Sequence, residues 1–476
     1  MKENTLNTKE LKELLDKASA KDKVLNLYTT KRDNKILLKA QYKNGSKDDK
    51  FELISKKNLA ITEFKENNEA YIFLDEKFED YDDLVSLIDN VIVKRSRNYQ
   101  IDIASFVNGK IKIEDALKAF YSRIIFYYAD LFNKKKEQAT KNEYSFLLAN
   151  DSWKELANKY AIIAMNRNIC RNLQVMPENY CTSEQLADYI KADFEELKDV
   201  KVSVLDKKQI KEIKMNLILA VNRGSTYEPR VVVLEYNGNP KSKDKVVVIG
   251  KGITFDTGGV NTKGYHMEGM KYDMSGSVIA AYALKSVAQL KIKKNMAVVM
   301  CITDNRLDGD AALPENLYES MSGLSVEVTD TDAEGRLVMA DGLYYGATIL
   351  NATTLIDVGT LTGAVLRTLG ATYSGIWSTE DDNWKVMEQA GNVAHEKVWR
   401  LPFHEDYNEP NTESIVADLN NYNSSEKSDS NTAAMFLKQF TNMVPYIHCD
   451  VAGTADLGGK PQGVLIDTLV EFVNLK

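Results

Sequence analysis

The chain has 476 residues, a formal net charge of −8 and a hydrophobic content of 44%. This length exceeds what a single compact core usually serves, so we expect two globular domains. The acidic balance argues against nucleic acid as the main ligand of the whole molecule.

Residues 1–155 are predicted to form a small N-terminal α/β domain to which the sequence assigns no role. The polar start has no apolar signal core, and no apolar run approaches the roughly 18 residues that a membrane span needs. A strand-like run occupies 70–74, and helical periodicity appears in 80–93 and 115–132. The four cysteines form no C-x-x-C pair, which fits a reducing compartment. We therefore expect a cytoplasmic protein without membrane contacts.

Residues 156–476 are predicted to form a second, larger α/β domain. A helix-like stretch at 153–173 leads to Pro177, which suits a connector between domains. Beyond residue 200, short apolar runs alternate with helical patterns such as 275–290, for which Ser275 is the expected cap. This alternation predicts a mainly parallel central sheet covered by helices, with functional loops at the carboxyl ends of its strands. The runs expected to be strands are 216–221, 230–236, 245–250, 295–302, 353–359 and 446–453.

The stretch DTDAEGRLVMADGL at 330–343 gathers acids at the start of an apolar helical pattern. Its acids could simply favour a helix start, where negative charge is stabilising. They also match several positions of a calcium-binding loop ending at Asp341, although that loop wants a glutamate there and a helix before it. The preceding SVEVTD alternates like a strand instead. A third interpretation is that the acids hold catalytic cations.

Two further loops carry charged residues. The loop in 246–259 completes neither glycine-rich phosphate motif, and its single D-T-G lacks the second copy that an aspartic protease needs. Asp256 could therefore merely cap a tight turn. In the loop at 261–277, Lys263 and Asp273 would each be read as surface residues if they stood alone.

Taken together, the three loops favour a metal site. Four carboxylates that converge without cations would repel strongly, whereas two divalent ions would balance them. An oxygen-rich set without thiolates suits magnesium, manganese, cobalt or zinc. The charged residues that the loops contribute are Asp256, Asp273, Asp332, Glu334, Lys251, Lys263 and Arg336.

At these residues the sequence resembles the leucyl aminopeptidase (cytosol aminopeptidase) family of two-metal exopeptidases. The family's N-T-D-A-E-G-R-L stands here as DTDAEGRL at 330–337, and its G-K-G-I-T-F-D-S-G-G as GKGITFDTGG at 250–259. Lys263 followed by MEGMKYDM at 267–274, LIDVGTLTGA at 355–364 and HCDVAGTA at 448–455 match as well. The resemblance covers about residue 160 to the C-terminus, so it implies that the larger domain is catalytic.

The resemblance implies a metal-dependent aminopeptidase that removes N-terminal leucine-like residues from peptides. Asp256 and Glu334 would bridge two divalent ions, Asp332 would complete one site, and Lys251 with Asp273 the other. Manganese and zinc are the first candidates for the ions, with magnesium and cobalt as alternatives. Lys251 can ligate only as a neutral amine, so its pKa must fall far below about 10.4.

The resemblance also assigns the reaction's other participants. A water held between the metals would attack the peptide carbonyl, which Lys263 would polarise. Arg336 would hold a bicarbonate ion, a planar anion suited to a guanidinium. Family members assemble as hexamers, which implies a homohexamer here. The side-chain pocket would be lined by Met270, Thr360, Leu361, Gly363, Ala452 and Ala455.

The sequence departs from the family pattern at several places, none of them a proposed ligand. Asp330 stands where asparagine is usual, Gly264 replaces a common proline, and the span from Lys263 to Asp273 is one residue short. Gly359 replaces a common alanine, and 424–436 lacks the glycine pair often found before A-A. A second hypothesis, an added DNA-binding or scaffold role of the same oligomer, ranks low because every expected metal ligand is present.

Overall fold

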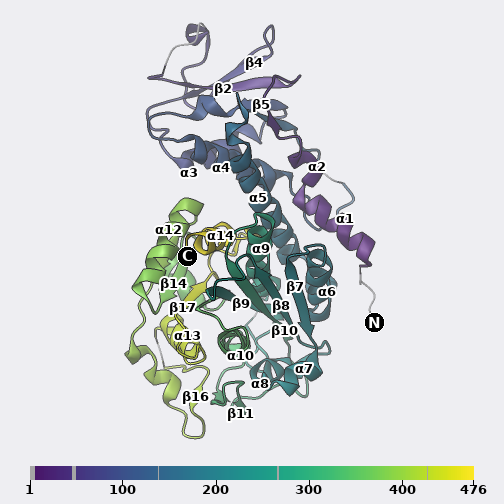
Figure 1. The fold of residues 1–476 in the computed structure, drawn as a ribbon, viewed down its shortest axis with the longest axis vertical. Coiled ribbons are helices and arrows are strands. Elements are labelled where there is room, and N and C mark those ends of the chain that lie inside the picture. Colours follow the sequence, from purple (N-terminus) through teal and green to yellow (C-terminus); the bar gives the residue numbers. More distant parts are fainter. Residues whose placement is uncertain (1–5, 46–49, 138, 265–266, 426) are drawn as a thin grey trace. The chain divides into compact units, whose positions relative to one another are not determined.

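The computed structural model describes residues 6–45, 50–137, 139–264, 267–425 and 427–476 (Figure 1). The chain divides into two compact units, one of them Leu14–Asn168 and the other the rest of the chain. The chain changes unit twice, after Glu13 inside α1 (Thr8–Ser19) and after Asn168 inside α5 (Lys154–Val175). The boundary at residue 155 thus coincides with the start of that helix and remains our proposal. Among the described residues, none of the helices combines the length and the apolar character required to cross a bilayer.

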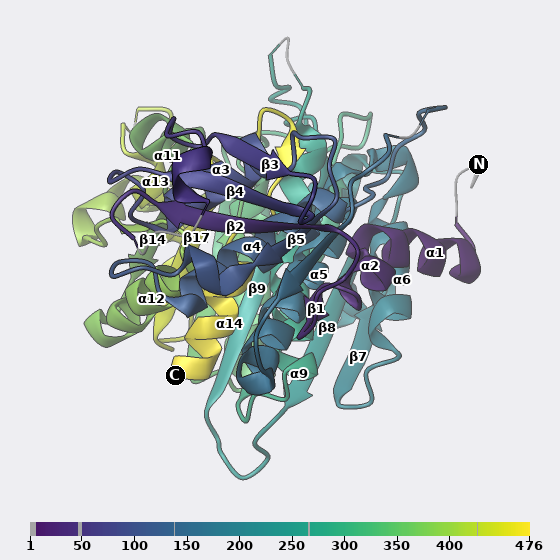
Figure 2. The same ribbon diagram turned by 90° about the horizontal axis from the view of Figure 1, so that it is seen from above.

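The N-terminal unit is an α/β unit built on a sheet in the order β1-β6-β5-β2-β4-β3. All neighbouring strands run parallel except β3 and β4; β5, β2 and β4 lie side by side in Figures 1 and 2. The predicted strand at 70–74 lies in β4. The predicted helix at 80–93 includes α3, and the predicted helix at 115–132 overlaps α4. Its elements are β1 (Tyr28–Thr29), β2 (Ile36–Tyr42), β3 (Ile61–Phe64), β4 (Glu69–Leu74), β5 (Tyr99–Asp102), β6 (Tyr144–Leu147), α2 (Lys21–Val24), α3 (Tyr81–Leu87), α4 (Ile113–Tyr128) and the second half of α1 (Thr8–Ser19).

The larger unit contains the predicted central sheet, in the order β15-β14-β17-β13-β9-β10-β8-β7. Its centre, β17-β13-β9-β10, is parallel, while β8 and β7 continue it antiparallel. The strands are β7 (Val200–Leu205), β8 (Arg230–Asn237), β9 (Lys245–Asp256), β10 (Asn295–Asn305), β13 (Thr354–Gly359), β14 (Ser374–Ser378), β15 (Val398–Arg400) and β17 (Tyr446–Asp450). The mixed α/β class with a mainly parallel sheet is confirmed.

Helices cover both faces of this sheet. Val247 and Ile249 of β9 belong to the same core as Leu343 of α10 (Glu334–Thr348). On the other face, the backbone of Ser277 in α9 (Ser275–Gln289) approaches Gly250 of β9. Figure 1 shows α9 and α10 on opposite sides of β9 and β10. The remaining elements are α6 (Ser183–Phe194), α7 (Lys207–Glu212), α8 (Asn216–Val221), α11 (Gly363–Leu369), α12 (Asp381–Ala394), α13 (Asp429–Lys438), α14 (Ile466–Leu475), β11 (Asn316–Glu319), β12 (Ser325–Val328), β16 (Leu419–Asn420), β18 (Asp456–Leu457) and β19 (Lys460–Pro461).

Two local predictions were wrong. Residues 216–221 form the helix α8 rather than a strand, since a short apolar run does not by itself separate a strand from a buried helix. Ser275 does not cap α9, because it is already the first helical residue. Its hydroxyl donates to the Tyr272 carbonyl at 2.5 Å and accepts from Gln174 Nε2 at 2.8 Å.

Asp341 is predicted to be a strong determinant of stability. It is fully buried, and its carboxylate accepts N–H groups from Leu217 and Ile218 at the start of α8 and from Met321. Because each buried donor left without an acceptor costs about 1–3 kcal/mol, Asp341→Ala should lower the free energy of unfolding by about 3 kcal/mol. Urea denaturation measures this change, with the exposed Asp199→Ala as the control. Equal midpoints for the two variants would contradict the prediction.

Candidate active site

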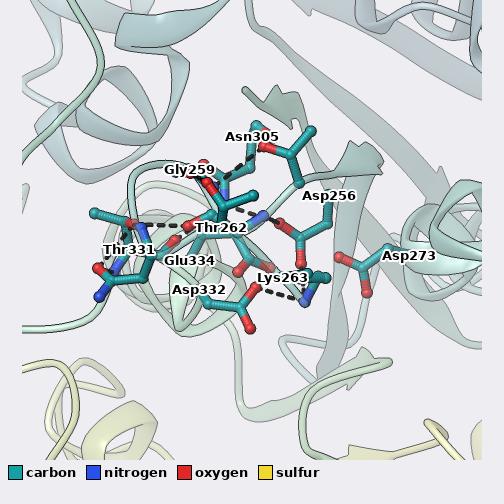
Figure 3. Close-up of polar contacts among 12 residues, drawn as sticks. Asp256, Gly259, Thr262, Lys263, Asp273, Asn305, Thr331, Asp332 and Glu334 are labelled. Carbon is teal, nitrogen blue, oxygen red and sulfur yellow. Dashed lines mark hydrogen bonds and ion pairs between the residues drawn. The ribbon is translucent and has the colours of Figure 1, made fainter. Parts of the chain in front are cut away.

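The charged residues singled out in the sequence meet at the carboxyl end of β9 and the start of α10. Lys251 lies within β9, Asp256 ends it, and Glu334 is the first residue of α10. Asp273 lies in a 3₁₀ turn (Met270–Met274) that leads directly into α9. Figure 3 shows Asp256, Asp273, Asp332 and Glu334 gathered around the Lys263 amine. The three loops therefore form one cluster.

Ion pairs link the cluster. Lys263 Nζ lies 2.6 Å from Asp256 Oδ2 and 2.5 Å from Asp332 Oδ1. Lys251 Nζ lies 2.9 Å from both Asp273 Oδ1 and Glu334 Oε1. The four carboxylates outnumber the two ammonium groups, so the cluster keeps an excess of negative charge.

This excess appears in the pKa values of the carboxyl groups. Burial, reinforced by repulsion from Asp256, raises the pKa of Glu334 to about 7 and that of Asp332 to about 6. Burial and the charges of Glu334 and Asp256 raise the pKa of Asp273 to about 8, against the opposing effect of Lys251. The acids of this cluster thus resist ionising together unless more positive charge is supplied.

The pKa of Lys251 also reflects the excess of negative charge in the cluster. Burial lowers the pKa of its amine, but attraction by Asp273, Glu334 and Asp256 outweighs burial and raises the pKa above its usual value. Among these carboxylates alone, Lys251 is therefore an ammonium. Ligation through a neutral amine requires nearby dications that reverse the local potential.

The buried oxygens fit a divalent cation. Asp256, Asp332 and Glu334 each offer one carboxylate oxygen, all within 4.8 Å of one another. Within the described parts of the chain, Glu334 Oε2 and Asp273 Oδ2 are buried without a hydrogen-bond partner. Buried anionic oxygens without a partner are costly, and hard divalent cations prefer such ligands.

Asn305 is a supporting residue that the sequence did not reveal. Its Nδ2 donates to Asp256 Oδ1 at 2.8 Å, and the Gly258 N–H donates to the same oxygen at 2.9 Å. These bonds leave Asp256 Oδ2 facing Lys263. The parallel register, which places Asn305 opposite Asp256, would have identified it, but register is not visible in a single sequence.

The turn after Asp256 requires its glycines. Gly258 and Gly259 both have positive φ, at 84° and 62°. A Cβ on Gly258 would lie 2.9 Å from Asp332 Oδ1, and one on Gly259 would lie 3.0 Å from Asn305 Oδ1. Asp256 does cap this turn through Gly258, as the simpler interpretation held, but it also faces the cluster.

The structure contradicts the calcium-loop interpretation of 330–343, whereas the helix-start interpretation holds for Glu334, which lies in the first turn of α10. The residue that precedes α10 is Ala333, which makes no side-chain capping bond. Asp341 lies inside α10 and caps α8 instead of completing a calcium loop. Asp330 accepts the Asp332 N–H at 2.8 Å, so it shapes the turn that carries Asp332.

Gly335 gives Lys251 the room it occupies. A Cβ at position 335 would lie 2.5 Å from Lys251 Cε and 2.7 Å from its Nζ. Because the end of a lysine side chain can move, Gly335→Ala should leave the fold intact but displace the amine. Misplacement by about 1 Å can cost about 10²-fold in rate, so we expect a loss of that size in the rate of any reaction catalysed at this cluster. Steady-state kinetics beside thermal unfolding test it, with Gly309→Ala, where a Cβ meets nothing within 4 Å, as the control. Unchanged rates would contradict this role of Gly335.

Asp450 is a second residue missed from the sequence. It is fully buried at the end of β17 and accepts N–H groups from Leu361 at 3.1 Å, Thr362 at 3.0 Å and Ala452 at 3.0 Å. Thr360 in this loop donates to Asp273 Oδ1 at 2.7 Å, and its carbonyl accepts from Lys251 at 2.9 Å. An acid at the carboxyl end of a parallel strand was the available signal.

The residues predicted to line the pocket lie on three segments. The Asp450 carboxylate accepts N–H groups from Leu361, next to Thr360, and from Ala452, and so joins their two segments. Gly363 lies in the first of these segments, where it begins α11. Met270 opens the turn that carries Asp273, and Ala455 is buried with 1% of its surface exposed. Their joint role in binding a side chain stays a prediction.

Arg336 lies in the first turn of α10 and is 2% exposed. Its Nη1 donates to the Asn421 carbonyl at 2.9 Å, and its Nη2 donates to Asp429 Oδ1 at 2.9 Å. The guanidinium is therefore held by the protein on two sides.

Comparison with known proteins agrees with the motifs. Residues 168–470 match the catalytic domain of the cytosol aminopeptidase family. A probable cytosol aminopeptidase of Metamycoplasma salivarium is 52% identical over 449 residues, which are 93% of this chain and 86% of that protein. One of Mycoplasma pneumoniae is 39% identical over 376 residues, or 78% of this chain and 84% of that protein. The resemblance recognised from the motifs is thus confirmed, and the chain belongs to the cytosol aminopeptidase family.

Proposed function

We propose that this chain is a metal-dependent aminopeptidase that removes N-terminal leucine-like residues from peptides. The observation that carries the proposal is the convergence of Asp256, Asp332 and Glu334, whose oxygens lie within 4.8 Å of one another in a largely buried cluster. Family membership and the names of the relatives support the reaction class.

Five side chains would hold two divalent cations. When bound, such a pair supplies Lewis-acid activation of water and of the peptide carbonyl. Manganese or zinc is our first choice, and magnesium or cobalt also suits oxygen ligands. The proposed ligands are Lys251, Asp256, Asp273, Asp332 and Glu334.

The other side chains would orient and stabilise the substrate. Asp256 and Asp332 hold the Lys263 ammonium within the cluster, where it can donate to the oxygen that gains negative charge during attack. Asp273 Oδ2 is available to accept the substrate's free α-amine, which would restrict cleavage to the first residue. A pocket of methionine and small residues suits leucine-like side chains.

The surroundings of Arg336 do not fit the bicarbonate that the family resemblance implies. Both terminal nitrogens of its guanidinium already donate to protein oxygens, one of them a carboxylate. We therefore assign no proton transfer to a bicarbonate ion in this chain.

Chelation tests the proposed function directly. We expect the purified protein to hydrolyse leucine p-nitroanilide, to lose this activity after dialysis against a chelator, and to regain it with manganese or zinc. N-acetyl-leucine p-nitroanilide should not be cleaved, because its amine is blocked. Absence of hydrolysis with every divalent metal, or hydrolysis that resists chelation, would refute the proposal.

The assembly and location remain expectations drawn from the resemblance. A homohexamer predicts a solution mass about six times that of the chain, which light scattering after size exclusion measures. Fractionation of cells would test the expected cytoplasmic location.

A further inference from the structure

We infer that Asp429 is a built-in counter-ion that takes the place of bicarbonate at Arg336, so that hydrolysis by this chain is independent of bicarbonate. The inference rests on the proposed function. It begins from the ion pair between Arg336 Nη2 and Asp429 Oδ1 at 2.9 Å, in which the two side chains are 3% and 24% exposed.

This ion pair lies beside the proposed metal ligands. Arg336 follows Glu334 by two positions in α10, and Asp429 is the first residue of α13. The next residue, Ser430, hydrogen-bonds through its hydroxyl to Thr362 at 2.8 Å. Thr362 belongs to the loop whose Thr360 contacts Lys251 and Asp273. Asp429 thus stands where α13 meets both α10 and this loop.

The opposite side of the guanidinium is also occupied. Asn421, whose carbonyl accepts from Arg336 Nη1, is itself fixed by its own side chain, which donates to the Asp330 carbonyl at 2.6 Å and the Ala333 carbonyl at 3.2 Å. The Tyr422 ring lies 5.9 Å from the guanidinium carbon. Of the Arg336 nitrogens, only Nε lacks a partner within the described residues. Each terminal nitrogen thus gives one of its N–H groups to the protein, and the carboxylate of Asp429 already balances the positive charge that would attract a planar anion.

Competition should favour Asp429 over a dissolved anion. A carboxylate and bicarbonate both bind to guanidinium N–H donors. Because the Asp429 carboxylate is tethered to the same chain, it competes at a high effective concentration. The start of a helix also stabilises the negative charge of Asp429. A second anion here would be repelled by Asp429 and by the carboxylate cluster. Asp429 lies in 424–436, the stretch without the glycine pair often found in the family.

Anion binding tests the inference without relying on activity. Metal-replete wild type and Asp429→Gly are titrated with ¹³C-bicarbonate in carbon dioxide-free buffer, and binding is followed by NMR line broadening. We expect saturable binding by Asp429→Gly and none by the wild type. Asp429→Asn, of nearly the same shape, serves if the glycine variant does not fold. Asp381→Gly is the matched control, because Asp381 also begins a helix and pairs with an arginine, Arg400, but is 74% exposed.

Kinetics supply the second measurement. In bicarbonate-free buffer, Asp429→Gly should lose about 10–100-fold in kcat, the usual effect of removing an outer-shell partner, and added bicarbonate should restore it. The wild-type and Asp381→Gly rates should not respond to bicarbonate. Saturable binding or severalfold stimulation of the wild type would overturn the inference, as would an Asp429→Gly variant that neither binds nor responds. A wild type that binds no bicarbonate and hydrolyses nothing would instead refute the proposed function.

Discussion

Replacing Glu334 by glutamine is expected to lower kcat/KM for leucine p-nitroanilide by at least about a thousandfold. Glutamine keeps the size of the side chain but removes its charge at the centre of the cluster, where Glu334 Oε1 pairs with Lys251 and Oε2 is buried without a partner. Bound divalent ions stabilise the transition state by several kcal/mol, and losing that stabilisation lowers the rate by about this factor. Elemental analysis of the same sample should show fewer bound manganese or zinc ions per chain.

The control for this variant is Glu212→Gln, at an exposed glutamate on α7 whose carboxylate lies 3.9 Å from the Lys208 amine on the same helix. It should retain wild-type activity and metal content. If Glu334→Gln kept both as well, Glu334 would not be a metal ligand, and the assignment of the cluster would fail.

The sequence indicated which charged residues lie together better than it indicated the local structure around them. Asp256, Asp332 and Glu334 lie in short, distinctive motifs, so their meeting at the ends of strands follows from an α/β sheet and the family resemblance. The helix at 216–221 depends instead on Asp341, more than a hundred residues away, which accepts its first N–H groups. Nothing local to that run distinguishes it from a buried strand.

Long-range partners explain the other differences. Asn305 acquires its role because the strand register places it opposite Asp256. Asp450 acquires its role from three N–H groups in the segments that follow β13 and β17. Arg336 lies close to the cluster in the chain, but its ion pair joins residues 93 positions apart. Spacing within a motif does not reveal which distant side chain meets it, because that pairing depends on how the helices pack.

Removing the ammonium of Lys263 should separate catalysis from metal binding. Lys263→Met keeps the length of the side chain, but it loses the donor that faces the cluster between Asp256 and Asp332. Loss of one donor to a developing oxyanion typically costs about 10²–10³-fold in kcat, so we expect a loss of this size with KM little changed.

The metal content of Lys263→Met should stay at the wild-type level, since the carboxylates and Lys251 remain in place. Lys263→Arg should recover part of the rate, because it restores the charge with different geometry. Lys243→Met, at an exposed position before β9, is the control and should behave as wild type. If Lys263→Met lost its metals, the role of this lysine would be to organise the metal ligands. If the variant kept full activity, other groups would have to stabilise the oxyanion.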